Sequence, residues 1–304
     1  MLATLKDVLS KARKRGYAVA AFNTNNMEIT QAIIRAAEHM KSPVIIQTTE
    51  SAIEYAGLDY LYSIIKVAAD TSRVPVVMHL DHGKNLNIIK KCIEKGYSSV
   101  MIDASHLSYE DNVSTTKKVV DMARRNNVSV EAELGTIGGA EDKVESREIT
   151  MTDPYMAKDF VEKTGIDALA IAIGTSHGAY KFSGKAKLDI KRLREIRKIV
   201  KIPLVLHGAS GVPAEVVRKA RLYGAKLSDT SGVSDAQLRL AIKNGINKVN
   251  TDTDLRLAFD AAVRESVKKY PEVFDPRKIL GHARDYMQKI AEHRIIICGS
   301  KNKR

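Results

Sequence analysis

The chain has 304 residues, of which 44% are hydrophobic and 28% are charged, which is typical of a globular protein with a sizeable core. No apolar stretch approaches the roughly 20 residues of a membrane span, and two cysteines without metal-type spacing exclude a disulfide framework, so we expect a cytoplasmic protein with no membrane partner. The net charge of +13 favours a solvated basic surface that attracts phosphates, because the basic residues are spread over helices and Trp is absent; a nucleic-acid-binding protein is a remote alternative.

The first segment, "MLATLKDVLSKARKRG", predicts an amphipathic helix, since charges run throughout it where a signal peptide has an apolar region. Short apolar runs rich in β-branched residues follow, and each predicts a buried strand. They cover residues 17–23, 43–49, 74–81, 98–104, 128–134, 168–174, 203–208 and 247–252.

Segments with helical periodicity separate these strands. Several begin at a capping residue or a proline, such as Asn26, Asp153-Pro154 and Pro213. Strands buried on both faces that alternate with helices predict an α/β fold, a (β/α)8 TIM barrel with an extra N-terminal helix and a C-terminal helical extension from about Leu255. An open doubly wound sheet is the alternative, weakened because "FNTNN" stands where a GxGxxG motif is expected.

No linker or low-complexity segment divides the chain, so we predict a single domain over residues 1–304. Three connections are long: 135–153, 175–188 and 225–233. Long loops in compact domains usually serve function, so these segments are candidates for lids or binding loops.

Histidines follow three of the predicted strands. His82, His177 and His207 come just past the third, sixth and seventh strands, where the ends of parallel barrel strands share one mouth. Three His ligands with open positions are typical of a catalytic zinc site. Asp81 lies beside this set, and His79, on the strand itself, is expected to face the core or to support a metal ligand from behind.

Glycine-rich stretches follow two late strands, "GTSHGAYK" (174–181) and "HGASG" (207–211), and "NTDT" (250–253) stands at the end of the last strand. Exposed backbone N–H groups in such loops bind phosphate in many barrels. Together with Lys181, they favour a phosphorylated substrate.

Motifs spread from the first strand to the last resemble the class II, metal-dependent fructose-bisphosphate aldolases, including their tagatose-bisphosphate relatives. The matching stretches are "AFNTNN" (21–26), "HLDHG" (79–83), "SVMIDASH" (99–106), "VEAELGTIGGAED" (130–142), "GTSHGAYK" (174–181), "LVLHGASGVP" (204–213) and "KVNTDTDLR" (248–256). The resemblance covers the whole chain.

The resemblance implies a metal site. His82, His177 and His207 are similar to the family's zinc ligands, and Asp103 and Glu133 to its outer or alternate metal carboxylates. Many relatives also bind a monovalent cation, sodium or potassium, near the phosphate loops, and form homodimers or homotetramers.

The resemblance also implies catalytic roles. Asp81 is similar to the acid/base for the hydroxyl proton at the cleaved bond, and Glu141 to the carboxylate that moves the proton on the dihydroxyacetone phosphate carbon. The expected substrate-binding residues are Asn23, Thr49, Gly178, Lys181, Gly208, Ser210, Asn250, Asp252 and Thr253.

The implied reaction is the reversible cleavage of fructose 1,6-bisphosphate to two triose phosphates, as in glycolysis and gluconeogenesis. A tagatose-1,6-bisphosphate aldolase is the alternative within the family. A zinc hydrolase on the same barrel is disfavoured because its HxH motif is missing from the first strand. Arg256, Arg277 and Arg284 remain candidates for the second phosphate.

Overall fold

The computed structural model describes residues 1–304 except 137, 142–143, 147–149, 178–186 and 228–231. Of residues 138–141, 144–146 and 176–177 it describes only the backbone. The strands of the barrel are β1 (Val19–Asn23), β2 (Val44–Thr48), β3 (Val76–Gly83), β4 (Ser99–Ile102), β5 (Ser129–Leu134), β8 (Ala168–Ile171), β10 (Leu204–Leu206) and β11 (Ile246–Thr251). The helices are α1 (Leu5–Arg15), α2 (Met27–His39), α3 (Glu50–Ala56), α4 (Leu58–Thr71), α5 (Leu86–Lys95), α6 (Tyr109–Arg124), α7 (Pro154–Thr164), α8 (Ile190–Ile199), α9 (Ala214–Leu222), α10 (Asp235–Lys243), α11 (Thr253–Lys269) and α12 (Pro276–Cys298).

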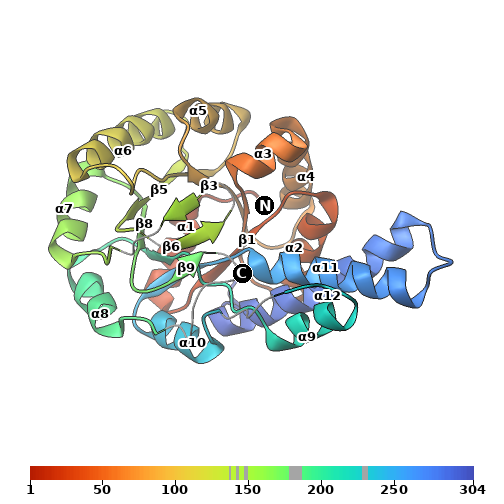
Figure 1. Cartoon of the computed structure of the whole chain (residues 1–304). Coiled ribbons are helices and arrows are strands. Elements are labelled where there is room, and N and C mark those ends of the chain that lie inside the picture. Colours follow the sequence, from red (N-terminus) through yellow and green to blue (C-terminus); the bar gives the residue numbers. More distant parts are fainter. Residues whose placement is uncertain (137, 142–143, 147–149, 178–186, 228–231) are drawn as a thin grey trace.

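The strands form a closed barrel in the order β1-β11-β10-β8-β5-β4-β3-β2, and the pairs between them are parallel. Helices surround the barrel, as Figure 1 shows. Each strand overlaps the range that the sequence predicts, so the predicted (β/α)8 barrel is confirmed. The prediction succeeds because strands covered on both faces are apolar on both faces, which distinguishes them from the amphipathic helices.

Helix α1 closes the N-terminal end of the barrel. Its apolar residues Leu5, Val8 and Leu9 pack with side chains from the lower barrel interior, such as Ile45 and Val77. The helix begins at Thr4, whose side chain accepts a hydrogen bond from the backbone N–H of Asp7, and ends at a left-handed Gly16. The extra N-terminal helix thus leaves the opposite end of the barrel as the open one.

Strand β3 shows how the interior is layered. Met78 and Leu80 pack in the core between strands and helices, whereas Val77 packs with α1 inside the barrel. Alternation therefore directs Val77, His79 and Asp81 inward at successive heights. His79 is fully buried one layer below Asp81, as the sequence predicts.

The connection 135–153 is not only a loop. Its described backbone contains β6 (Gly138–Glu141) and β7 (Val144–Ser146), which pair antiparallel, and β6 pairs in parallel with β9 (Ser176–His177). This small sheet lies over the barrel in Figure 1. Hydropathy does not predict it because main-chain pairing in a Gly-rich segment needs no buried side chains.

The C-terminal extension is confirmed as the helix pair α11 and α12, which projects from the barrel in Figure 1. Among the described residues, no helix combines the length and the hydrophobicity needed to cross a bilayer.

Candidate active site

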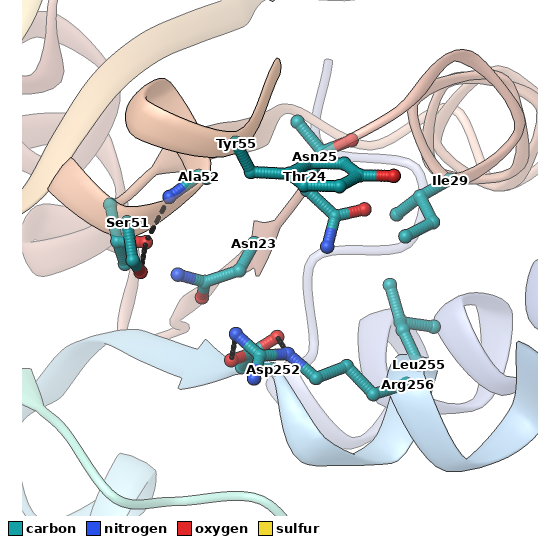
Figure 2. A pocket seen from close by; sticks show the side chains of 11 residues that line it. Asn23, Thr24, Asn25, Ile29, Ser51, Ala52, Tyr55, Asp252, Leu255 and Arg256 are labelled. Atoms are coloured by element: carbon teal, nitrogen blue, oxygen red, sulfur yellow. Dashed lines mark hydrogen bonds and ion pairs between the residues drawn. The ribbon is translucent and has the colours of Figure 1, made fainter. Parts of the chain in front are cut away.

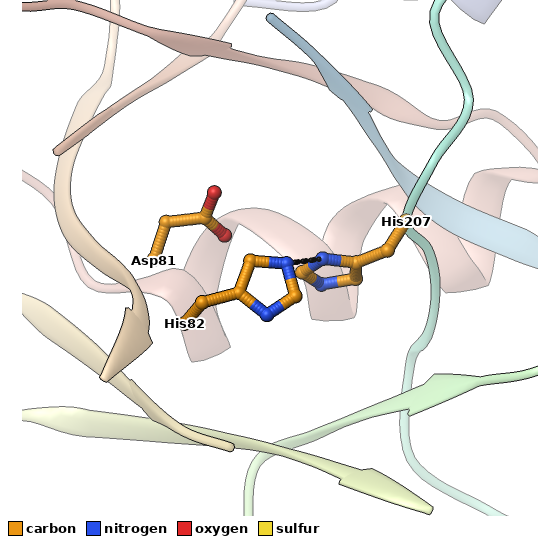
Figure 3. A group of neighbouring side chains, drawn as sticks. All are labelled: Asp81, His82 and His207. Atoms are coloured by element: carbon orange, nitrogen blue, oxygen red, sulfur yellow. Dashed lines mark hydrogen bonds between the residues drawn. The ribbon is translucent and has the colours of Figure 1, made fainter. Parts of the chain in front are cut away.

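The carboxyl end of β3 brings two neighbouring residues to the barrel mouth. Asp81 and His82 would face opposite sides of a regular strand. His82, however, has a φ of 46°, in the left-handed region, and the register with β4 shifts between Leu80 and Gly83. This irregularity directs both side chains into the mouth (Figure 3), a rare backbone conformation of the kind that clusters at functional sites.

Gly83 is required by the same turn. A Cβ added at Gly83 would lie 2.6 Å from the carbonyl oxygen of Met101 and 2.9 Å from Cγ1 of Ile89. No side chain fits there, so the glycine allows β3 to bend against β4.

Asp81 is held by three amide side chains. Its Oδ2 accepts hydrogen bonds from Nδ2 of Asn23 at 3.0 Å and Nε2 of Gln47 at 2.9 Å, and its Oδ1 accepts from Nδ2 of Asn250 at 3.0 Å. Asn23 and Asn250 are among the predicted residues, but Gln47 was missed. The sequence could have indicated Gln47, because it is a polar residue at an inward position that follows three apolar residues of the strand.

His82 lies in an acidic environment. Its Nδ1 is 2.9 Å from Oδ2 of Asp103. Burial lowers the pKa of His82, but Asp81, Asp103 and Glu133 outweigh it and raise that pKa to about 10. Burial and the nearby Asp103 raise the pKa of Glu133 well above its usual value.

His207, which follows β10, faces His82 directly. Its Nδ1 lies 2.8 Å from Nε2 of His82, and its Nε2 lies 2.7 Å from Oε1 of Glu131, as Figure 3 shows for the two histidines. Since a carboxylate only accepts hydrogen bonds, the far nitrogen of each ring carries its hydrogen toward Asp103 or Glu131. The two facing nitrogens then present lone pairs to one point, which requires a cation or a proton between them.

The donor set fits a metal ion. Ligand atoms of Asp81, His82 and His207 lie within 4.8 Å of one another, and so do those of His82, Asp103 and Glu133. Oε2 of Glu133 is buried with no hydrogen-bond partner among the described residues. Imidazoles whose second nitrogen is held by a carboxylate are the usual arrangement of metal-binding histidines.

Several predicted site residues lie outside the description. Gly178 and Lys181 are not among the described residues, and of His177 and Glu141 only the backbone is described, in β9 and β6. Gly139 of β6 pairs with His177 of β9, so the two strands are neighbours.

The loops after β10 and β11 meet beside the histidines. The backbone N–H of Asp252 donates to Oγ of the buried Ser210 at 3.3 Å. Asp254 accepts from the N–H groups of Gly211 and Val212 at 3.1 and 2.8 Å, which ties the loop that begins with Gly208 to the start of α11. Thr253 is the first residue of that helix, and the N-terminus of a helix attracts anions.

A pocket of about 230 Å³ extends from Asn23 along the mouth. Ser51 lies on one side, and Asp252 and Arg256 lie on the other, as Figure 2 shows. Thr49, whose Oγ1 lies 2.9 Å from Oγ of Ser51, also lines the pocket. Arg256 is bound to Asp252, with Nε 2.8 Å from Oδ1 and Nη2 2.7 Å from Oδ2.

The other two arginines that the sequence offers lie outside this lining. Arg277 makes an exposed ion pair with Asp275 at 2.8 Å, and Arg284 donates to Gln31 at 2.7 Å. Arg256 therefore lines the same pocket as Thr49 and Asp252, whereas Arg277 and Arg284 lie outside its lining.

Comparison with known proteins agrees with this site. The family model "Fructose-bisphosphate aldolase class-II" matches residues 3–303. A fructose-bisphosphate aldolase of Thermus caldophilus is 49% identical over 302 residues, covering 99% of both chains, and one of Helicobacter pylori (strain ATCC 700392 / 26695) is 44% identical over 306 residues, covering both chains fully. Among solved structures, the YdjI aldolase from Escherichia coli K12 matches with a TM-score of 0.83 and 33% identity, covering 100% of this chain and 99% of its own.

These matches span the whole barrel, from the first strand to the C-terminal extension. The chain belongs to the class-II fructose-bisphosphate aldolase family.

Proposed function

We propose that this member of the family is a zinc-dependent enzyme that reversibly cleaves fructose 1,6-bisphosphate to dihydroxyacetone phosphate and glyceraldehyde 3-phosphate. The observation that carries the proposal is the pair of facing imidazole nitrogens of His82 and His207, 2.8 Å apart and beside Asp81. The fructose-bisphosphate names of its relatives favour fructose over tagatose bisphosphate.

In this proposal His82, His177 and His207 hold the zinc ion, and Asp103 and Glu133 are outer or alternate metal carboxylates beside His82. When bound, zinc supplies a Lewis acid for the negative charge that develops as the carbon–carbon bond breaks. Side chains of the protein carry out the proton transfers and bind the substrate.

Asp81 acts as the acid/base at the cleaved bond. In the cleavage direction it takes the proton from the hydroxyl group on the aldehyde-forming half, and it returns that proton in the reverse direction. The amides of Asn23, Gln47 and Asn250 hold both carboxylate oxygens, so the group meets the substrate in one orientation.

Glu141 is proposed to protonate the carbon of the departing ketose phosphate. Support comes from its position on β6, whose Gly139 pairs with His177 on β9. A carboxylate carried by a short sheet over the mouth can also exclude water when the sheet closes on the substrate.

The first phosphate is proposed to bind among Gly178, Lys181, Gly208, Ser210, Asp252 and Thr253. The N-terminus of α11 and the loop after β10 supply the backbone N–H groups. We also propose that a monovalent cation, sodium or potassium, binds beside these loops.

The second phosphate is proposed to bind Arg256, with Thr49 and Ser51 on the opposite side of the pocket. Arginine recognises phosphate through several N–H groups in a fixed plane. Asn23 lines this pocket together with Arg256 and also donates to Asp81, so the pocket adjoins the proposed site of bond cleavage.

We also propose a single-domain cytoplasmic protein that serves glycolysis and gluconeogenesis and assembles as a homodimer or homotetramer. The assembly is supported by apolar side chains exposed where α11 ends and α12 begins. Val267 and Tyr270 are each 55% exposed, and Phe274 is 93% exposed.

A cleavage assay coupled to triose-phosphate detection tests the proposal. We expect turnover of fructose 1,6-bisphosphate, its loss after removal of metal by a chelator, and its return with zinc. Tagatose 1,6-bisphosphate, assayed in parallel, should be cleaved more slowly. Full activity after chelation contradicts the metal requirement, and faster cleavage of the tagatose epimer contradicts the assigned substrate.

A further inference from the structure

The interior of the barrel, one layer below the mouth, contains a buried charge pair that the proposed reaction does not use. Glu131 on β5 and Lys248 on β11 are both fully buried, and Nζ of Lys248 lies 2.8 Å from Oε2 of Glu131. Moving two charges out of water costs several kcal/mol for each. Apolar side chains fill the layer below, so packing alone does not require charges here.

The donor and the acceptor of each hydrogen bond in this layer follow from the chemical groups involved. Oε1 of Glu131 accepts from Nε2 of His207 at 2.7 Å. Nζ of Lys248, which can only donate, lies 3.3 Å from Nε2 of His79, and Nδ1 of His79 lies 2.8 Å from Oγ of Ser99. His79 therefore accepts from the lysine and donates to the serine.

The two bonds of Glu131, to His207 and to Lys248, determine how His207 meets the mouth. Because Glu131 can only accept, the hydrogen of His207 stays on Nε2, and Nδ1 keeps a lone pair that faces His82 at 2.8 Å and the side-chain amide nitrogen of Asn250 at 3.1 Å. Lys248 occupies the other carboxylate oxygen, which compensates the buried negative charge and fixes the rotation of the carboxylate.

We propose that Glu131 and Lys248 are positioning residues that hold His207 as the Nε2–H tautomer and so prepare its Nδ1 to bind metal. The inference rests on the proposed metal-binding role of His207. Neither residue touches the mouth, and both act through the imidazole.

Replacing Glu131 with glutamine, which has the same shape, should reverse the tautomer of His207. In Glu131→Gln the amide has one acceptor and one donor end, and the ammonium of Lys248 claims the oxygen. The amide NH2 then faces Nε2 of His207, which must accept, so the hydrogen moves to Nδ1 and blocks the metal site. We expect the affinity for zinc to fall about 10- to 100-fold, the usual effect of losing such a supporting group.

A second change should reverse the first. In Glu131→Gln/Lys248→Met no ammonium binds the amide oxygen, so this oxygen can accept from Nε2 of His207 while the NH2 group turns toward His79, whose Nε2 lies 3.7 Å from the replaced carboxylate oxygen. Because the amide oxygen then faces Nε2 of His207, we expect the double variant to regain the Nε2–H tautomer and most of the lost affinity. A purely structural role predicts the opposite, since two core changes would harm the site more than one.

The experiment has two readouts on the full-length chain. Nitrogen-15 spectra of the histidine rings, recorded after chelation and assigned with a His207→Gln variant, report the tautomer without any metal or activity. Competition with a chromogenic chelator reports the affinity for zinc. Ser99→Ala is the matched control, because it removes a buried polar group from the same layer without contact to His207, and it should leave both readouts of that histidine unchanged.

An Nδ1–H tautomer of His207 in the wild-type chain overturns the proposal, and this measurement needs no variant to fold. A Glu131→Gln chain that keeps the Nε2–H tautomer, or a double variant no better than the single one, also overturns it. If the chain bound no zinc at all, the proposed function would fail, while the tautomer measurement would still decide the role of Glu131.

Discussion

Replacing Arg256 with alanine should weaken catalysis for substrates with a second phosphate and spare those without one. Arg256 lines the pocket that starts at Asn23, opposite Thr49, where the far phosphate of a bisphosphate is proposed to lie. Its guanidinium is paired with Asp252 by two contacts of 2.8 and 2.7 Å, so its direction is set before the substrate arrives.

The size of the effect follows from the exposure of the guanidinium. A hydrogen bond to a charged group contributes about 1.5–3 kcal/mol. The side chain of Arg256 is 44% exposed, so solvent screening favours the lower half of that range. At 1.4 kcal/mol for each factor of ten, kcat/KM for fructose 1,6-bisphosphate should fall about 10- to 40-fold.

The assay is a cycle of two proteins and two substrates. Wild type and Arg256→Ala are each measured with fructose 1,6-bisphosphate and with fructose 1-phosphate. The substitution also frees Asp252, which belongs to the proposed site of the first phosphate, and that loss is common to both substrates. The ratio of the two losses isolates the contact with the second phosphate.

Arg277→Ala is the control, because Arg277 forms an exposed pair with Asp275 away from the pocket. Arg277→Ala should change kcat/KM for either substrate by no more than about twofold. Equal losses for both substrates in Arg256→Ala, or a loss selective for the bisphosphate in Arg277→Ala, would refute the assignment of Arg256.

Asp81→Asn should lower kcat about 10²- to 10⁴-fold, because an amide of the same shape cannot take the hydroxyl proton. Its zinc content should stay near one per chain by elemental analysis, and a near-normal rate would remove Asp81 from the chemistry. Glu265 accepts from Lys219 and Lys269 at 2.7 Å and from His282 at 3.0 Å; burial opposes them, but these partners hold its pKa below the usual value. A lowered folded-state pKa stabilises the protein above the unfolded value, and this contribution is lost progressively as the pH falls from the unfolded value through the folded one, so Glu265→Gln should lower Tm by a few degrees at pH 7 and by less and less as the pH drops below the usual glutamate pKa. A Tm difference that does not shrink in acid would contradict this origin.

Much of the barrel follows from local patterns in the sequence. Strands covered on both faces must be apolar throughout, and the helices that cover them must be amphipathic, so the alternation identifies both elements and their parallel order. Motifs at the strand ends then bring Asp81, His82 and His207 to one mouth, because all parallel strands of a barrel end on the same side.

The interior layers could not be predicted in the same way. Gln47, Glu131 and Lys248 lie on predicted strands, and the sequence shows only that a polar residue stands at each position. Their role depends on the register between strands, which decides that Lys248 meets Glu131 and that Glu131 meets His207 across the barrel.

The sequence by itself determined the barrel, the histidines at its mouth and the family resemblance, since periodicity and motifs are properties of short segments. Only the tertiary structure decided how Asp81 and His82 act together, because adjacent residues of a regular strand face opposite sides and a left-handed φ of 46° at His82 overrides that rule. It also singled out Arg256 among three arginines, because the lining of a pocket depends on residues far apart in the chain.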